Sequence, residues 1–331
     1  MSARQPDGTP APDAVLLHEA ALLATRAPSI HNSQPWQWRI AGDELDLFLS
    51  HDRLLPRSDP TARLAVLSCG AALHHARMEL AGAGAHCVVD RMPDPADPGH
   101  LARLRIDRRM PADPSARRLA EAAAARRTDR RMRPALPLDT HKLQGVAAAV
   151  RREGAVLTTV QARQVFELAA AMDDARRAMA GVPGLQTELA GWIGGSRPSG
   201  AGVPDSALAL DPTWHAESRH DLGRPGRALI AETHHRAAVF AVLHGAGDER
   251  TDWLGGGEAL SAAWLTATAL DLSVLPLSAV VEVADSRTAI RRLTGVGGFP
   301  YLVLRFAAAD PAAGPGRPTP RLPVSAVIDR P

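Results

Sequence analysis

A short loop near the start of the chain carries four side chains that can hydrogen-bond the edge of a flat polar molecule: Ser29, His31, Asn32 and Gln34. The loop lies within residues 26–38, where Pro28 ends an alanine-rich helical pattern and Trp36 begins a strand-like run. Side-chain amides and a hydroxyl at such a corner suit a polar heterocycle. An ordinary Pro/Asn/Ser connecting loop has the same composition, so this stretch alone leaves both interpretations open.

A second feature, Arg126-x-Thr128-x-Arg130, places a hydroxyl between two guanidinium groups just past another helical pattern. Arginine binds phosphate oxygens in pairs and with the help of charge, so three converging donors suit a phosphate dianion. The alternative is an arginine-rich helix end favoured by the helix dipole. A third feature, residues 275–278, is a turn between strand-like runs that could offer backbone N–H groups to a ring.

Other patterns indicate no further chemistry. The pairs His74-His75 and His234-His235 lack an acidic partner at the spacing of a zinc-binding helix, so we expect no metal site. The chain contains no Gly-x-Ser-x-Gly segment, which argues against a hydrolase of that class.

Composition indicates the broad class of protein. The chain has 331 residues, of which 45% are hydrophobic and 22% charged, as in soluble globular proteins. Its formal net charge of +2 is too small to indicate a nucleic-acid partner. Cys69 and Cys87 lie in apolar stretches without metal-ligand spacing, and no run of 18 apolar residues occurs. We therefore expect reduced thiols, no membrane partner and a cytoplasmic location.

Helical and strand-like patterns alternate along the chain in two cycles. The first cycle predicts helices at 13–27 and 65–82 and strands at 36–40, 45–49, 87–91 and 101–107. The second predicts helices at 115–127, 139–153, 161–180 and 257–270 and strands at 156–160, 238–243, 273–276, 280–283 and 301–306. We expect an α+β protein of two pseudo-symmetric halves, residues 1–110 and 111–331, with mixed, mainly antiparallel sheets flanked by helices. Residues 181–227 are rich in Gly and Pro and lack periodicity, which is typical of a functional insert.

These features match a known family in order and spacing. The first loop resembles the Pro-Ser-x-x-Asn-x-Gln-Pro-Trp segment of the FMN-dependent nitroreductase superfamily. Arg126-x-Thr128-x-Arg130 is similar to that family's Arg-x-Ser-x-Arg/Lys phosphate motif, and residues 276–278 resemble its turn beside the flavin ring. Thr319-Pro-Arg321 resembles its C-terminal segment, whose arginine also contacts the phosphate. The resemblance extends over about residues 13–329.

The distribution of the motifs resembles one branch of that family, the Acg-type FMN-binding proteins. An ordinary nitroreductase chain begins with the phosphate motif and reaches the Pro-Ser-x-x-Asn loop one helix later, and two identical chains enclose each flavin. Here the first half has only the loop, and the second half has only the phosphate motif. The resemblance therefore implies a monomer that imitates a dimer and keeps one FMN site, with residues 181–227 as its lid.

The motif positions imply the site residues. The phosphate of FMN would be held by Arg126, Thr128, Arg130 and Arg321. The edge of its isoalloxazine ring would be lined by Pro28, Ser29, Ile30, His31 and Asn32. The turn near its reactive nitrogen would consist of Pro276, Leu277 and Ser278. No catalytic acid or base is implied, because a flavin carries the redox chemistry itself.

The resemblance implies an oxidoreductase that passes electrons or hydride from the flavin to a small acceptor, such as a nitro compound, a quinone or a specialised substrate. The alternative is a protein that stores or sequesters FMN under the lid without turning over NAD(P)H. A structural protein that has lost the flavin is a third possibility. Bleaching of a bound flavin by NADPH would separate the first two.

Overall fold

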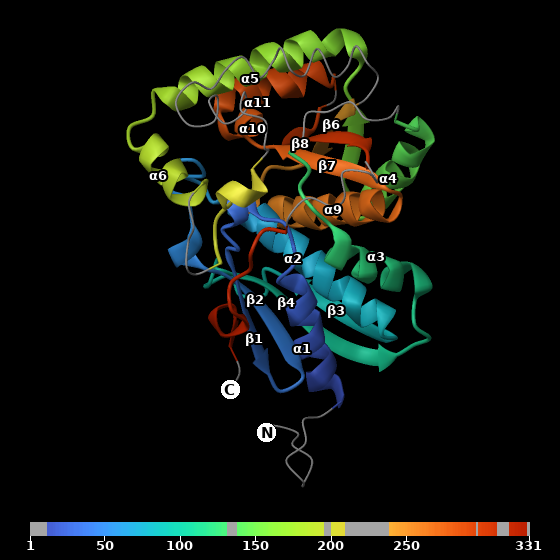
Figure 1. The fold of residues 1–331 in the computed structure, drawn as a ribbon. Coiled ribbons are helices and arrows are strands. Elements are labelled where there is room, and N and C mark those ends of the chain that lie inside the picture. Colours follow the sequence, from blue (N-terminus) through green and yellow to red (C-terminus); the bar gives the residue numbers. More distant parts are fainter. Residues whose placement is uncertain are drawn as a thin grey trace.

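The computed structural model describes residues 12–130, 138–194, 200–208, 238–295, 297–309 and 318–329. In these ranges the chain forms two separate sheets and the helices that flank them (Figure 1). None of the helices described there is long and apolar enough to cross a membrane.

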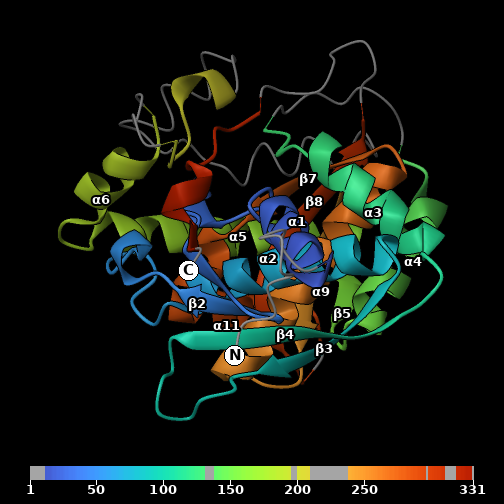
Figure 2. The same ribbon diagram turned by 90° about the horizontal axis from the view of Figure 1, so that it is seen from below.

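The first half of the chain builds one sheet and covers one of its faces. Its elements are α1 (Pro12–Ala24), β1 (Trp36–Ala41), β2 (Glu44–Leu49), α2 (Arg63–Gly82), β3 (Ala85–Arg91) and β4 (His100–Arg109). Alternate residues of β1 are buried, among them Trp36 and Trp38, because one face of this strand packs on the core. Helices α1 and α2 supply the other side of that core (Figure 2).

The second half builds a sheet that is covered on both faces. Its strands are β5 (Val156–Thr159), β6 (Ala238–Gly245), β7 (Leu272–Leu277) and β8 (Phe299–Ala308). Its helices are α3 (Pro114–Ala125), α4 (Thr140–Arg152), α5 (Val165–Ala180), α6 (Leu185–Trp192), α9 (Arg250–Ala269), α10 (Ala279–Glu282) and α11 (Ala284–Leu293). Strands β6 and β8 are almost entirely buried, as expected of a sheet with helices on both sides (Figure 1).

The two sheets follow the same plan. In sheet A, β2 leads through α2 to β3 and β4, and the strand order is β3-β4-β2-β1, extended by a fifth strand, β9 (Ile328–Asp329). In sheet B, β6 leads through α9 to β7 and β8, and the order is β7-β8-β6-β5. The described strand pairs are antiparallel except for β1 with β9. The predicted α+β class with mainly antiparallel sheets is confirmed, and the repeated plan agrees with two related halves.

Several predicted elements were wrong. Residues 280–283 were expected to form a strand, but α10 occupies most of that stretch and α11 follows it; a short apolar run does not distinguish helix from strand. Helix α9 begins at Arg250, because Glu249 and Asp252 form a capping box ahead of the glycines that were taken as the helix start.

Two further elements carried no sequence signal that we recognised. Helix α6 lies inside the stretch 181–227, which was expected to lack regular structure. Strand β9 returns the end of the chain to sheet A, where Trp38 N donates to Val327 O at 2.8 Å. A strand of two residues is too short to show any alternation of polar and apolar residues.

Candidate functional site

A small pocket of about 80 Å³ lies where the C-terminal end of α1 meets the segment after α3. It is lined mainly by cationic side chains, with the full set being Arg26, Ala123, Arg126, Arg127, Thr128, Arg130, Pro318, Thr319 and Arg321. Within the described ranges, no carboxylate forms an ion pair with any of the five arginines. Such a concentration of unbalanced positive charge suits an anion.

Backbone carbonyls after α1 hold two of these arginines in place. Arg126 donates from Nη2 to Arg26 O at 3.0 Å, and its guanidinium lies 4.8 Å from the centre of the Trp264 ring. Arg321 donates from Nε to Thr25 O at 2.9 Å and from Nη2 to Arg26 O at 3.0 Å. The carbonyls at a helix C-terminus carry partial negative charge, so they orient guanidinium groups well but neutralise little of their charge.

The electrostatics of the pocket show that an anion would be stabilised there. Burial lowers the pKa of Arg126 well below its usual value, and the charges of Arg321, Arg127 and Arg130 lower it further. Burial also lowers the pKa of Arg130 and of Arg321 to about 10. The Nε atoms of Arg126 and Arg127 are buried without a hydrogen-bond partner among the described residues. A buried donor without an acceptor is costly, and phosphate oxygens would supply acceptors and negative charge together.

The Pro-Ser-x-x-Asn loop adjoins this pocket in a strained conformation. His31, Asn32 and Gln34 have positive φ angles of 44°, 54° and 52°, which are uncommon outside glycine. Hydrogen bonds fix the loop: Ile30 N donates to Ser68 Oγ at 3.1 Å, and Gln34 N donates to Ser29 Oγ at 3.0 Å. Strain that surrounding contacts maintain is characteristic of binding sites.

Asn32 and His31 connect the loop to its surroundings. Asn32 Nδ2 donates to Gly202 O at 2.8 Å and to Pro320 O at 3.0 Å, and its Oδ1 accepts from Arg321 Nη1 at 3.2 Å. The Nε2 atom of His31 is buried without a partner in the described part of the chain. Burial lowers the pKa of His31 to about 4, with a further contribution from the charge of Arg130, so this imidazole is neutral at pH 7.

The third predicted stretch lies next to the phosphate motif. Thr128 forms a bridge with Val274 of β7, and Asp129 N donates to Val274 O at 3.1 Å. Pro276, Leu277 and Ser278 follow two residues later and are each half-buried. The structure therefore brings the loop, the arginines and the turn together around the end of α1.

The sequence prediction omitted several residues of this region. Arg26 and Arg127 line the pocket, but in a chain so rich in arginine neither stands out. Residues 200–208 also reach the site: Gly200 O accepts from Gln34 Nε2 at 3.1 Å, and Ala207 O accepts from Arg130 Nη1 at 3.2 Å. Of the predicted lid, residues 195–199 and 209–227 lie outside the described ranges.

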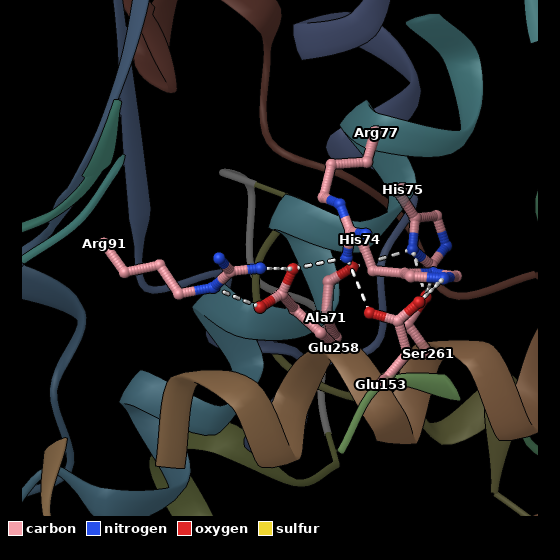
Figure 3. A network of polar contacts seen from close by, with 8 residues as sticks. All are labelled: Ala71, His74, His75, Arg77, Arg91, Glu153, Glu258 and Ser261. Carbon is pink, nitrogen blue, oxygen red and sulfur yellow. Dashed lines mark hydrogen bonds and ion pairs between the residues drawn. The ribbon is translucent and has the colours of Figure 1, made fainter. Parts of the chain in front are cut away.

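An ion-pair network occupies the place that corresponds to this site in the other half (Figure 3). Arg91 ends β3 as Leu277 ends β7, and Glu153 follows α4 as the Pro-Ser-x-x-Asn loop follows α1. Arg77 Nη1 donates to both Glu153 Oε2 and Glu258 Oε1 at 2.6 Å, and Arg91 Nε donates to Glu258 Oε2 at 2.8 Å. Paired side chains at this position agree with the expectation of one site per chain.

His74 adjoins this network and leads to a prediction about acid stability. Its Nδ1 lies 2.8 Å from Ser261 Oγ, and burial, with a contribution from Arg77, lowers its pKa to about 3 from the ordinary 6.5. Between these values the unfolded chain binds a proton that the folded chain does not, so stability falls as pH falls. Replacing His74 with Gln is expected to reduce the loss of unfolding free energy between pH 7 and pH 5 by about 2 kcal/mol.

Urea unfolding at pH 7, 6 and 5 measures this effect. The exposed His141 on α4 offers the matched control, His141→Gln. An equal pH slope in His74→Gln and the parent protein would contradict the prediction.

Comparison with known proteins identifies full-length relatives. No protein-family model matches the chain. It is 36% identical over 326 residues to "Putative NAD(P)H nitroreductase Rv3131" of Mycobacterium tuberculosis (strain ATCC 25618 / H37Rv), covering 97% of this chain and 93% of that protein. It is 33% identical over 338 residues to "Putative NAD(P)H nitroreductase acg" of the same strain, covering 95% of each.

Solved structures resemble the chain less closely. NfnB of Mycobacterium smegmatis, an FMN-dependent nitroreductase solved with NADPH, is 18% identical, with a TM-score of 0.42 over 63% of this chain and 97% of that one. The assignment rests on the full-length relatives alone. With more than 30% identity over nearly their whole length, this chain belongs to the nitroreductase family that includes acg and Rv3131.

Proposed function

We propose that this protein is an FMN-dependent oxidoreductase that binds one flavin per chain and passes electrons from NAD(P)H to a small acceptor. The observation that carries the proposal is the arginine pocket, in which two guanidinium Nε atoms are buried without partners. The residues present fit FMN, because the pocket supplies donors for a phosphate and adjoins a loop rich in amide and hydroxyl groups. The names of the relatives favour an enzyme over the alternative of a storage protein.

The residue roles follow from this arrangement. Arg126, Thr128, Arg130 and Arg321 would hold the phosphate, and Arg26 and Arg127 would add positive charge at the pocket rim. Ser29, Ile30, His31 and Asn32 would orient the ring edge, with Pro28 setting the entry of the loop. Pro276, Leu277 and Ser278 would lie against the reactive edge. The flavin would supply the redox chemistry, while the protein positions it and excludes water.

The two halves divide the work of binding. We place them at residues 1–110 and 111–331, so that the loop comes from one half and the phosphate motif from the other. A single chain would then imitate a nitroreductase dimer as a monomer. A cytoplasmic location is proposed as well, supported by the free cysteines Cys69 and Cys87.

The lid, residues 181–227, would be anchored by one carboxylate. Glu188 on α6 accepts hydrogen bonds from Arg57 N at 3.0 Å and from Ser58 N and Oγ, both at 2.9 Å. Replacing Glu188 with Ala removes three charge-assisted bonds and is expected to speed FMN release about tenfold. Stopped-flow capture of released FMN by an excess of apoflavodoxin measures the rate. Glu167→Ala, an exposed change on α5, is the control, and equal release rates in both variants would contradict the anchor.

The visible spectrum of the purified protein tests the proposal as a whole. One FMN per chain, released by heat, is expected, and anaerobic NADPH should bleach it. A bound flavin that NADPH does not bleach would support the storage alternative. A protein that refuses added FMN would contradict the flavin function altogether.

A further inference from the structure

A buried carboxyl group lies close to the turn at residues 276–278 and has no role in the site described so far. Glu282 is the last residue of α10, and both of its carboxyl oxygens are buried without a hydrogen-bond partner among the described residues. Its backbone N donates to Ser278 O at 3.2 Å, so a single helical turn separates Glu282 from the turn residue Ser278. Buried polar atoms are nearly always paired, so a carboxyl left in this state calls for an explanation.

The charged groups around Glu282 are already engaged with other partners. Asp59 accepts from Ala65 N at 2.9 Å and caps α2. Arg63 of α2 donates to Val281 O, and Glu188 of α6 is bound by backbone and hydroxyl donors. Arg287 of α11 pairs with Asp248. These contacts leave the Glu282 carboxyl free to exchange a proton with a bound molecule.

The protonation of Glu282 suits that role. Burial raises its pKa from the ordinary 4.5 to about 7, and the charges of Asp59 and Glu188 raise it too, against smaller opposing effects of Ser278 and Arg63. The carboxyl is therefore protonated below about pH 7 and ionised above it. A general acid works best when its pKa lies near the operating pH.

Glu282 also faces the same space as the flavin loop. The charge of Glu188 acts on both Glu282 and His31, and His31 belongs to the loop that lines the site. The carboxyl thus lies between the insert helix α6 and the turn, on the side where an acceptor would approach the ring edge.

We propose that Glu282 is the proton donor to the acceptor that is reduced at this site. The inference rests on the proposed function, because it requires a hydride equivalent from NAD(P)H. Reduction of a nitroarene to a nitrosoarene takes up one hydride and one proton, breaks one N–O bond and releases water, while the nicotinamide is oxidised. The proton passes from the Glu282 carboxyl to the departing oxygen, and the carboxylate then regains a proton from solvent.

The experiment compares Glu282→Gln with Glu121→Gln, an exposed change on α3, in full-length protein loaded with FMN. Nitrobenzene serves as the acceptor that requires a proton, and ferricyanide as a one-electron acceptor that requires none. Glu282→Gln is expected to slow nitrobenzene reduction about 100-fold and to leave ferricyanide reduction unchanged. In the parent protein the nitrobenzene rate should fall above about pH 7, and this pH dependence should vanish in Glu282→Gln.

Infrared spectroscopy gives a readout that does not depend on turnover. The band of a protonated carboxyl should titrate near neutral pH in the parent protein and be missing in Glu282→Gln. If both variants reduce nitrobenzene with the parent rate and pH profile while NADPH still bleaches the flavin, the role of Glu282 is overturned and the flavin function stands. If the parent protein neither retains FMN nor responds to NADPH, the proposed function fails first and this inference fails with it.

Discussion

Replacing Arg130 with alanine is expected to weaken FMN binding by about 10- to 100-fold, because a buried phosphate would lose a charge-assisted hydrogen-bonding partner worth roughly 1.5–3 kcal/mol. The effect should be large for a physical reason that concerns the whole pocket. Five arginines line it, and no described carboxylate pairs with them, so the phosphate would be the main balancing charge. The structural cost of the change is small, since Arg130 makes a single described hydrogen bond, to Ala207 O.

Fluorescence titration of the flavin-free protein with FMN measures this affinity, and riboflavin provides an internal control. Riboflavin has the same ring but no phosphate, so Arg130→Ala should leave its affinity unchanged. Arg152→Ala, an exposed change at the end of α4, controls for the loss of one positive charge. Equal losses of FMN and riboflavin affinity in Arg130→Ala would show that Arg130 supports the fold of the site and does not hold the phosphate.

The candidate site was predictable from sequence to the extent that its chemistry is local. Arg126-x-Thr128-x-Arg130 places its donors within five residues, and the loop around Asn32 concentrates its polar groups in the same way. Their meeting at the end of α1 is confirmed by the contacts of Arg321 with Thr25 O and Asn32 Oδ1. That meeting depends on chain folding over hundreds of residues, so only the family resemblance could predict it.

Residues whose role depends on their burial could not be predicted. Glu282 looks like any glutamate at the end of an apolar run, and only the packing around α10 makes its carboxyl unusual. Arg77 and Glu258 lie far apart in the sequence and pair because α2 and α9 adjoin. Pairing of this kind has no local pattern, whereas the helices that carry it show clear ones.

The contact between α2 and α9 shows how closely the two halves are fitted together. Gly70 and Gly257 are each the eighth residue of their helix. A Cβ atom at Gly70 would overlap Leu254 O, three residues before Gly257, and a Cβ atom at Gly257 would overlap Leu67 O, three residues before Gly70. The reciprocal pattern is that of two helices crossing on a pseudo-twofold axis. Because the obstacles are backbone atoms, rotation of a side chain cannot relieve them.

Replacing Gly257 with alanine is therefore expected to lower the free energy of unfolding by about 3 kcal/mol or more, since the added methyl group must push the helices apart. Gly255 in the same helix provides the matched control, because a Cβ there would meet no atom within 4 Å. Gly255→Ala should raise the stability by about 0.5–1 kcal/mol through the better helix propensity of alanine. Urea unfolding of both variants measures the difference.

Separation of the helices should also weaken FMN binding, because the loop at Asn32 and the arginines after α3 belong to different halves. Gly257→Ala is thus expected to lose riboflavin and FMN affinity together, in contrast to Arg130→Ala, which should lose FMN affinity alone. Gly70→Ala, which meets the same crossing from the other helix, should have the same two effects. If Gly255→Ala and Gly257→Ala unfolded alike and bound flavin alike, the close crossing would not be what aligns the two halves of the site.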